Sequence, residues 1–194
     1  MLKALILVGG VSSRMGKDKY LLNVNSKPQY IYLAELLKEL NIPIYISCNK
    51  NQQNNIESRF DVIVDIFQGV GPMGGIASAF ELDNNVDWLV IACDLILIDR
   101  ATIKFLISKQ DEPSDIITFI KRDSDFPETT ITIYKSSTHS LFKQAIADKS
   151  YSLQKILRKC KLETINPPEK NKLWNANTPI ELQEAQKFIK GLNL

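Results

Sequence analysis

The sequence predicts an α/β fold of three layers (α/β/α), in which helices cover both faces of one mostly parallel sheet. Two observations indicate this fold. Short β-branched runs alternate along the chain with longer segments of helical spacing, which is typical of strand–helix–strand units. The strand candidates are almost wholly apolar, which is typical of parallel strands buried on both faces. With 194 residues, 44% of them hydrophobic and 24% charged, the chain has the size of one globular domain, and we expect residues 1–194 to form it.

Six segments are expected to form the strands of this sheet. Residues 2–8 are nearly all apolar and stop at a pair of glycines, so they make the clearest candidate. Five shorter runs are assigned to strands because they too are apolar and β-branched. These runs are 42–47, 62–64, 88–92, 116–120 and 130–134.

Helices are expected between these strands. In residues 28–40 the apolar side chains share one helical face, and the same spacing follows Asp99, a candidate N-cap. The clearest helix start is Thr178, because a proline stands directly after it and Glu181 stands three residues beyond it. Further helical spacing is found in 76–80, 141–146, 153–160 and 182–192. Loops are expected at 109–114 and 166–172.

The charge and the counts of histidine and cysteine exclude several kinds of site. A net charge of +2 argues against a broad nucleic-acid-binding face and against a polybasic membrane surface. The one histidine, His139, is the only residue that could serve a Ser-His-Asp or Cys-His site, and we assign it no role. Three scattered cysteines form neither a Cys-x-x-Cys pair nor a disulfide framework. Since no apolar run approaches the roughly 20 residues that span a bilayer, we expect a cytoplasmic protein.

A glycine-rich stretch follows the first predicted strand, at residues 9–19. Ligands of open α/β sheets bind beyond the carboxyl ends of the strands, and glycines there let backbone N–H groups approach anionic oxygens. Serines add donors, and Arg14, Lys17 and Lys19 add positive charge, so the stretch could cradle a triphosphate. The alternative is a tight strand-to-helix turn with solvated charges. The spacing matches neither the P-loop nor the dinucleotide-binding fingerprint.

Three further segments lie where strands are expected to end or helices to begin. Asp94 follows the apolar run 88–92 and could hold Mg²⁺, which takes one or two carboxylates with phosphate oxygens and water, or it could cap a turn. The glycines of 69–75 could give a ligand access to a helix N-terminus or form a flexible loop. Asn175 and Asn177 could orient a polar ring or a phosphate, or satisfy the backbone of their own loop.

Together these segments resemble the molybdenum cofactor guanylyltransferases, which are MobA-like nucleotidyltransferases. Residues 7–19 (LVGGVSSRMGKDK) resemble the N-terminal signature of that family, and residues 71–76 (GPMGGI) resemble its Gly-Pro-Leu-x-Gly segment. Cys93-Asp94 is similar to its metal-binding Cys-Asp pair, and residues 175–179 (NANTP) are similar to its Asn-x-Asn-Thr-Pro segment. The four motifs occur in the family's order and span nearly the whole chain.

The resemblance implies a Rossmann-like domain of the nucleotide-diphospho-sugar-transferase type. Its reaction would join the GMP part of GTP to the terminal phosphate of molybdopterin, forming the molybdopterin guanine dinucleotide cofactor and pyrophosphate. The N-terminal half would bind the nucleotide, and the C-terminal half would bind the acceptor through Asn175 and Asn177. Arg14, Lys19 and Asp94 would be catalytic, and Asp94 would hold Mg²⁺, the one cofactor implied. The implied nucleotide-binding residues are Leu7, Val8, Gly9, Gly10, Ser12, Lys19, Asn49, Asp65, Gly71 and Asp94.

The implied chemistry suits these residue types. The attacking phosphate oxygen is already anionic at neutral pH, so a site without a histidine base is sufficient. Positioning and charge neutralisation by Arg14, Lys19 and the Mg²⁺ on Asp94 would carry the rate. Besides GTP and molybdopterin, the resemblance implies molybdenum-insertion or molybdoenzyme chaperone proteins as partners. We expect neither nucleic acid nor a membrane as a partner.

Other functions stay open at this point. A relative that uses CTP, or that acts on a sugar or alcohol phosphate, typically carries Ala-Ala-Gly at positions 8–10; we favour GTP because the second glycine here leaves room for a purine edge. A nucleotide-binding module without catalysis would be expected to lack Lys19 or Asp94, and both are present. The chain departs from the family pattern at Ile96, where proline is usual, and at Thr129-Thr130, where Pro-Leu is common.

Overall fold

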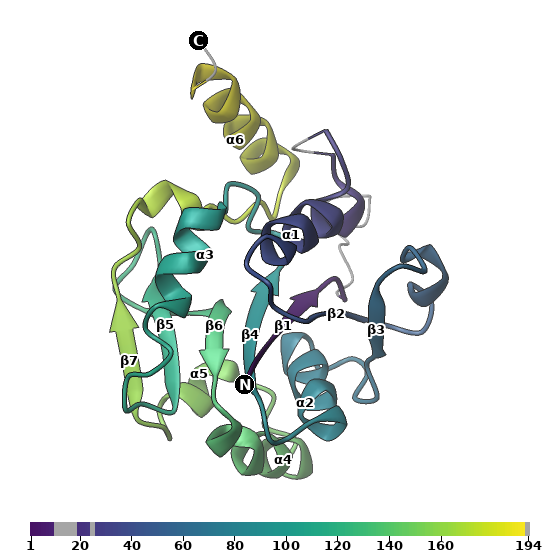
Figure 1. Cartoon of the computed structure of the whole chain (residues 1–194), viewed down its shortest axis with the longest axis vertical. Helices are drawn as coiled ribbons and strands as arrows, with labels where there is room; N and C mark the ends of the chain where they lie inside the picture. Colours follow the sequence, from purple (N-terminus) through teal and green to yellow (C-terminus); the bar gives the residue numbers. More distant parts are fainter. Residues whose placement is uncertain (10–18, 24–25, 193–194) are drawn as a thin grey trace.

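One seven-stranded sheet runs through the molecule in the computed structural model, which describes residues 1–9, 19–23 and 26–192 (Figure 1). The strands are β1 (Leu2–Leu7), β2 (Ile44–Cys48), β3 (Asp61–Val64), β4 (Asp87–Ala92), β5 (Ile116–Ile120), β6 (Pro127–Tyr134) and β7 (Leu162–Ile165). Their order in the sheet is β3-β2-β1-β4-β6-β5-β7. β6 is antiparallel to both of its neighbours, and every other pair is parallel. The predicted mostly parallel sheet is confirmed.

Helices cover both faces of the sheet, as predicted. α1 (Gln29–Lys38) and α3 (Arg100–Ile107) pack against one face, where Ala4 and Ile6 of β1 point. Leu5 and Leu7 point to the other face, which is covered by α2 (Pro72–Leu82), α4 (His139–Ala147) and α5 (Leu153–Leu157). Because successive side chains of a strand point to opposite faces, one apolar strand supplies both cores. This explains why β1 is apolar from Ala4 to Leu7.

Two predicted helix starts are confirmed by their cap hydrogen bonds. The Asp99 carboxylate accepts the backbone N–H of Thr102 at 2.9 Å and begins α3. In α6 (Pro179–Leu192), Glu181 Oε2 accepts the backbone N–H of Thr178 at 2.9 Å, and the Thr178 hydroxyl accepts that of Glu181 at 3.3 Å. This reciprocal pair is the capping box that the sequence predicted.

The structure differs from the predicted elements after α5. The strand β7 is absent from the predicted set, because it is short and exposes the side chains of Glu163 and Thr164 at the edge of the sheet, where it pairs with β5. The helix expected over 153–160 ends at Leu157, and the chain then turns into β7. The loop expected over 166–172 contains the start of a 3-10 helix, η4 (Lys170–Leu173).

The last helix, α6, extends away from the sheet at one end of the molecule (Figure 1). Its inward face packs on a small separate core that contains Ile96, Leu97, Ala176 and Ala185. α6 therefore begins beside the segment that follows β4. Among the described residues, no helix has the length and apolarity that crossing a membrane requires.

Candidate active site

The carboxyl ends of four neighbouring strands place four of the predicted site residues along one edge of the sheet. Gly9 lies just beyond β1, Asn49 follows β2, Asp65 follows β3, and Asp94 lies just beyond β4. The strand ends are level, because the last residues of β1 and β4 are paired with each other, and so are those of β2 and β3. Residues that are distant in the sequence are thus gathered where ligands of parallel sheets bind.

Asp65 is held at this edge by a serine of the neighbouring strand. Ser47 Oγ donates a hydrogen bond of 2.7 Å to Asp65 Oδ1, and Ser47 is fully buried. The other carboxylate oxygen lies beside Gly9, because a Cβ on Gly9 would be 3.1 Å from Asp65 Oδ2. Burial raises the pKa of Asp65 to about 6, and the hydrogen bond from Ser47 opposes this rise. Because Gly9 has no side chain, the space beside it is left to the Asp65 carboxylate.

The glycines that precede and open α2 bring this helix close to the sheet. Gly71, the residue before the helix, has a φ of 64°, in the left-handed region that favours glycine. A Cβ on Gly75 would lie 2.3 Å from Ser47 Oγ and 2.8 Å from Leu7 Cδ2. Only glycine lets the α2 backbone come this close to Ser47 and Leu7. The glycines are therefore explained by a close contact between helix and sheet, without the alternative of a flexible loop.

Asn49 and Gln52 shape the loop that follows β2. Asn49 Oδ1 accepts the backbone N–H groups of Asn51 and Gln52 at 2.9 and 3.1 Å. Gln52 accepts the backbone N–H of Asn49 through Oε1 at 3.2 Å and donates from Nε2 to the Val8 carbonyl at 3.4 Å. Gln52 was not among the predicted site residues, and nothing in the sequence distinguishes it from its neighbours Gln53 and Asn54. The predicted contact of Asn49 with a nucleotide stays a prediction.

The segment after β4 is hydrogen-bonded to the segment before α6. The backbone N–H of Ala176 donates to the carbonyl of Asp94 at 2.9 Å, and Leu95 forms an antiparallel bridge with Asn175. Asn175 Oδ1 is buried and accepts no hydrogen bond within the part of the chain that the structure describes. The aspartate predicted to bind metal and the asparagines predicted to bind the acceptor are therefore immediate neighbours.

Two further hydrogen bonds support this paired segment. The backbone N–H of Ile96 donates to the Trp174 carbonyl at 3.3 Å. Proline, which is usual in the family at position 96, has no N–H and could not make this bond. Gln29 of α1 is fully buried and donates from Nε2 to the Leu95 carbonyl at 3.0 Å. α1 thus fixes the backbone of the same segment from one side of the sheet.

A polar cavity of about 390 Å³ lies beside the two asparagines. Its lining includes Lys121 and Arg122, from the connection between β5 and β6, together with Trp174, Asn175 and Asn177. The Arg122 guanidinium lies 4.0 Å from the centre of the Trp174 ring, which is a cation–π distance. The cavity combines these amide, cationic and aromatic groups with the carboxylates of Asp123, Glu128, Glu181 and Glu184, so it offers both donors and acceptors to a polar ring, and its cations are Lys121 and Arg122.

Asp94 is chemically suited to Mg²⁺, because a carboxylate is a ligand that this ion prefers. Across the described residues, no group of three His, Cys, Asp or Glu side chains is placed to hold a metal ion. Mg²⁺ needs no such cluster, because it usually binds one or two carboxylates and takes its other ligands from phosphates and water. A half-buried carboxylate at the carboxyl edge fits an ion that arrives with a triphosphate.

Part of the predicted glycine-rich site lies outside the described residues. This applies to Gly10, Ser12, Arg14 and Lys17. Lys19 begins a short 3-10 helix, η1 (Lys19–Leu21). The side chains of Leu7 and Val8 are buried in the two cores, so any contact of these two residues with a nucleotide must come from their backbone, as the resemblance implies.

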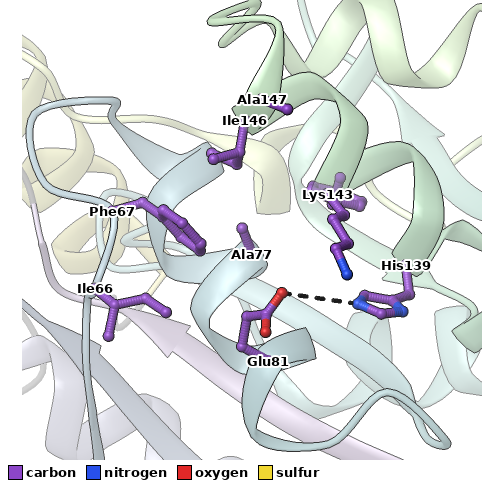
Figure 2. A pocket seen from close by; sticks show the side chains of 9 residues that line it. Ile66, Phe67, Ala77, Glu81, His139, Lys143, Ile146 and Ala147 are labelled. Carbon is purple, nitrogen blue, oxygen red and sulfur yellow. Dashed lines mark ion pairs between the residues drawn. The ribbon is translucent and has the colours of Figure 1, made fainter.

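The single histidine lies away from these residues, at the start of α4. Figure 2 shows it beside Glu81 of α2, with 3.9 Å between His139 Nε2 and Glu81 Oε1, at a cavity of about 260 Å³. The His139 ring also packs on Phe80, with 5.9 Å between the ring centroids. The histidine joins α4 to α2, and we assign it no chemical step.

The family of the chain follows from a comparison with known protein families. A family model described as the MobA-like NTP transferase domain matches residues 4–165. The chain belongs to this family. The matched region runs from β1 to the end of β7 and includes Gly9, Asp65 and Asp94. Asn175 and Asn177 lie beyond it.

Individual relatives and structures agree with membership of the MobA-like family. The chain is 32% identical over 179 residues to a "Molybdenum cofactor biosynthesis bifunctional protein" of Synechocystis, with 92% of this chain and 52% of the relative covered, so it spans about half of that protein. It is 29% identical over 183 residues to a "Molybdenum cofactor guanylyltransferase" of Vibrio parahaemolyticus, with 92% of each chain covered. The crystal structure of molybdopterin-guanine dinucleotide biosynthesis protein A of Archaeoglobus fulgidus has the same fold, with a TM-score of 0.82, 22% identity, and 97% of this chain and 99% of that chain covered.

Proposed function

We propose that this chain is a molybdenum cofactor guanylyltransferase, which transfers GMP from GTP to the terminal phosphate of molybdopterin and releases pyrophosphate. Its family and the guanylyltransferase of Vibrio parahaemolyticus support the reaction class. The observation that carries the proposal is the pairing of Asp94 and Leu95 with Asn175 and Ala176. This pairing joins the residue expected at the triphosphate to those expected at the acceptor, so both substrates can meet at one place.

The nucleotide is expected along the carboxyl edge of β3, β2, β1 and β4. The exposed backbone at Gly9 and the N-terminus of α2 after Gly71 offer N–H groups and a positive helix dipole. As the family resemblance implies, Lys19 and Arg14 would supply positive charge to the phosphates. When it is bound at Asp94, Mg²⁺ supplies further positive charge to the phosphate oxygens.

The acceptor is expected in the polar cavity beside Asn175 and Asn177, with its terminal phosphate toward Asp94. An anionic oxygen of that phosphate forms a bond to the α-phosphorus of GTP. The bond from the α-phosphorus to its bridging oxygen breaks, and the electron pair leaves with pyrophosphate. No protein base is required, so the residues contribute positioning and charge stabilisation.

A transfer assay with the purified chain, Mg²⁺ and molybdopterin, run separately with GTP, CTP and ATP, tests the proposal. We expect dinucleotide product with GTP at a rate at least tenfold above that with either other nucleotide. A preference for CTP would identify a cytidylyltransferase instead. Absence of product with all three would reject nucleotidyl transfer to this acceptor.

We also propose a cytoplasmic location and contact with molybdenum-insertion or molybdoenzyme chaperone proteins. The cysteines Cys48, Cys93 and Cys160 are all free thiols, which supports a reducing compartment. Cell fractionation and in-cell cross-linking of a tagged chain test both points. Recovery in the periplasm, or cross-links that include none of these proteins, would contradict them.

A further inference from the structure

Ser47 is a buried hydroxyl whose hydrogen bond goes to a carboxylate of the site. Its Oγ lies 2.7 Å from Asp65 Oδ1, and none of its surface is exposed. A serine in the middle of an apolar strand of this kind is unusual, because its neighbours Ile46 and Cys48 are buried and apolar. Its hydroxyl needs a buried partner, and Asp65 is that partner.

The packing of α2 restricts the Ser47 side chain. A Cβ added to Gly75 would lie 2.3 Å from Ser47 Oγ and 3.4 Å from Ser47 Cβ, so the helix backbone closes off the space on that side. The hydroxyl stays between Gly75 and Asp65. In turn, Asp65 Oδ1 is occupied by Ser47, and Oδ2 lies beside Gly9 at the exposed edge of the sheet.

We propose that Ser47 is a positioning residue for nucleotide binding: its hydroxyl orients Asp65 so that Oδ2 accepts a hydrogen bond from the nucleoside part of the nucleotide, beside Gly9. This inference rests on the proposed function. A carboxylate only accepts hydrogen bonds and repels phosphate, so its partner is an O–H or N–H donor of the ribose or base. A protonated Asp65 is a weaker acceptor, so the hydroxyl of Ser47 also extends binding to lower pH by favouring the ionised form.

Other ionisable groups near Asp65 do not replace Ser47 in this role. On β2, burial and the neighbouring Asp65 raise the pKa of the Cys48 thiol to about 11, so the thiol is neutral in the relevant range. On α2 and α4, Glu81, His139 and Lys143 line the cavity beyond Ile66 and Phe67 (Figure 2). Among the described residues, burial and the Ser47 hydroxyl are the influences that shift the pKa of Asp65.

The test measures the dissociation constant of GTP with Mg²⁺ by calorimetry between pH 5 and pH 8.5, for the wild type and Ser47→Ala. Because the terminal phosphate of GTP titrates near pH 6 as well (pKa about 6), the readout is the ratio of the two constants at each pH. Removing a hydrogen bond to a charged group is expected to raise, by about one pH unit, the pH below which protonation of Asp65 weakens GTP binding. The dissociation constant of Ser47→Ala should exceed that of the wild type at pH 8.5, because Asp65 is no longer held in place, and the ratio should be about fivefold larger at pH 6 than at pH 8.5.

Ser78→Ala is the matched control. Ser78 is also buried on the α2 side of the sheet, but its hydroxyl donates to the Gly74 carbonyl at 2.7 Å and accepts the Ile66 N–H at 3.0 Å, so its hydrogen bonds go to the backbone. Its ratio to the wild type should not vary with pH. A second variant, Asp65→Asn, should bind weakly at every pH, and adding Ser47→Ala to it should change nothing further.

The outcomes separate the inference from the proposed function. If the wild type binds no nucleoside triphosphate, the proposed function fails. The pairing of Ser47 with Asp65 is then still tested by carbon-13 NMR titration of the Asp65 carboxyl group in the free protein, because Ser47→Ala should raise the pKa of Asp65. If the wild type binds GTP but the Ser47→Ala ratio is the same at pH 6 and pH 8.5, Ser47 is merely structural and the inference is overturned.

Discussion

The backbone N–H of Ala176 donates to the carbonyl of Asp94 at 2.9 Å, which ties the end of the central strand β4 to the segment that opens α6. Together with the bridge between Leu95 and Asn175, this bond connects Asp94, which is proposed to face the triphosphate, to Asn175, which is proposed to face the acceptor. A chain that transfers a nucleotide between two bound substrates needs such a junction, because the rate depends on holding the reacting atoms in line.

Asp94→Asn should reduce GMP transfer by about a hundredfold or more, because the amide no longer provides the anionic ligand that Mg²⁺ prefers. Steady-state transfer at saturating substrates measures the loss. The melting temperature should stay near the wild-type value, since the backbone bond from Ala176 is retained. Asp111→Asn, in the exposed loop before β5, is the control and should be fully active. Activity of Asp94→Asn within threefold of the wild type would remove Asp94 as the metal ligand.

Asn177→Ala should raise the KM for molybdopterin about tenfold and leave the dissociation constant of GTP unchanged, because Asn177 borders the acceptor cavity and lost hydrogen bonds of this kind cost about 1–2 kcal/mol. Asn171→Ala, at an exposed position in η4, should change neither quantity. An equal loss of GTP affinity in Asn177→Ala would place this residue on the nucleotide side instead.

Gly75→Ala should lower the free energy of unfolding by about 1–3 kcal/mol, because its Cβ would overlap Ser47 Oγ at 2.3 Å and Leu7 Cδ2 at 2.8 Å. Urea unfolding followed by circular dichroism measures the change. Gly191→Ala, in α6, meets nothing within 4 Å and should leave stability unchanged or slightly raised. Equal stability of the two variants would contradict the close contact of α2 with the strand ends.

Asp65→Asn should stabilise the protein at neutral pH and lose that advantage in acid. Burial raises the pKa of Asp65 from its usual 3.8 to about 6, so the folded state holds this proton more tightly than the unfolded state. The contribution of Asp65 to the free energy of unfolding therefore falls as the pH rises from about 4 to about 6. The variant should gain about 2 kcal/mol over the wild type at pH 7.5 and almost nothing below pH 4.

Urea unfolding at pH 4 and pH 7.5 checks this difference. Asp61→Asn, at the exposed first position of β3, is the control and should show no such dependence on pH. The same stability difference for Asp65→Asn at both values would show that the carboxylate is not buried in the way the structure places it.

The sequence predicts the central sheet well because its strands are buried on both faces. β1 supplies Leu5 and Leu7 to one core and Ala4 and Ile6 to the other, so the strand is apolar from Ala4 to Leu7. The cap of α6 was equally clear, because Thr178 and Glu181 act through local backbone bonds whose spacing is visible in the chain. By contrast, β7 exposes Glu163 and Thr164 at a sheet edge, so its pattern lacks the apolar run by which the other strands were found.

The sequence predicted the motif residues of the site but not the residues that hold them in place. Asp65 and Asp94 were identified because they follow strands or match a family motif. Ser47 and Gln52 were not, because their roles depend on contacts between neighbouring strands and loops: Ser47 reaches Asp65 across β2 and β3, and Gln52 reaches the carbonyl of Val8. Such contacts depend on register and loop shape, which the local sequence does not specify.

The most direct test of the central claim follows the label of GTP through the reaction. The wild-type chain is incubated with Mg²⁺ and molybdopterin, once with GTP labelled at the α-phosphate and once with GTP labelled at the γ-phosphate, and the cofactor is separated from pyrophosphate. We expect the α-label to enter the cofactor and the γ-label to leave in pyrophosphate, and we expect Asp94→Asn to lose both transfers. Transfer of the γ-label to the acceptor, or turnover of GTP without labelled cofactor, would contradict the central claim.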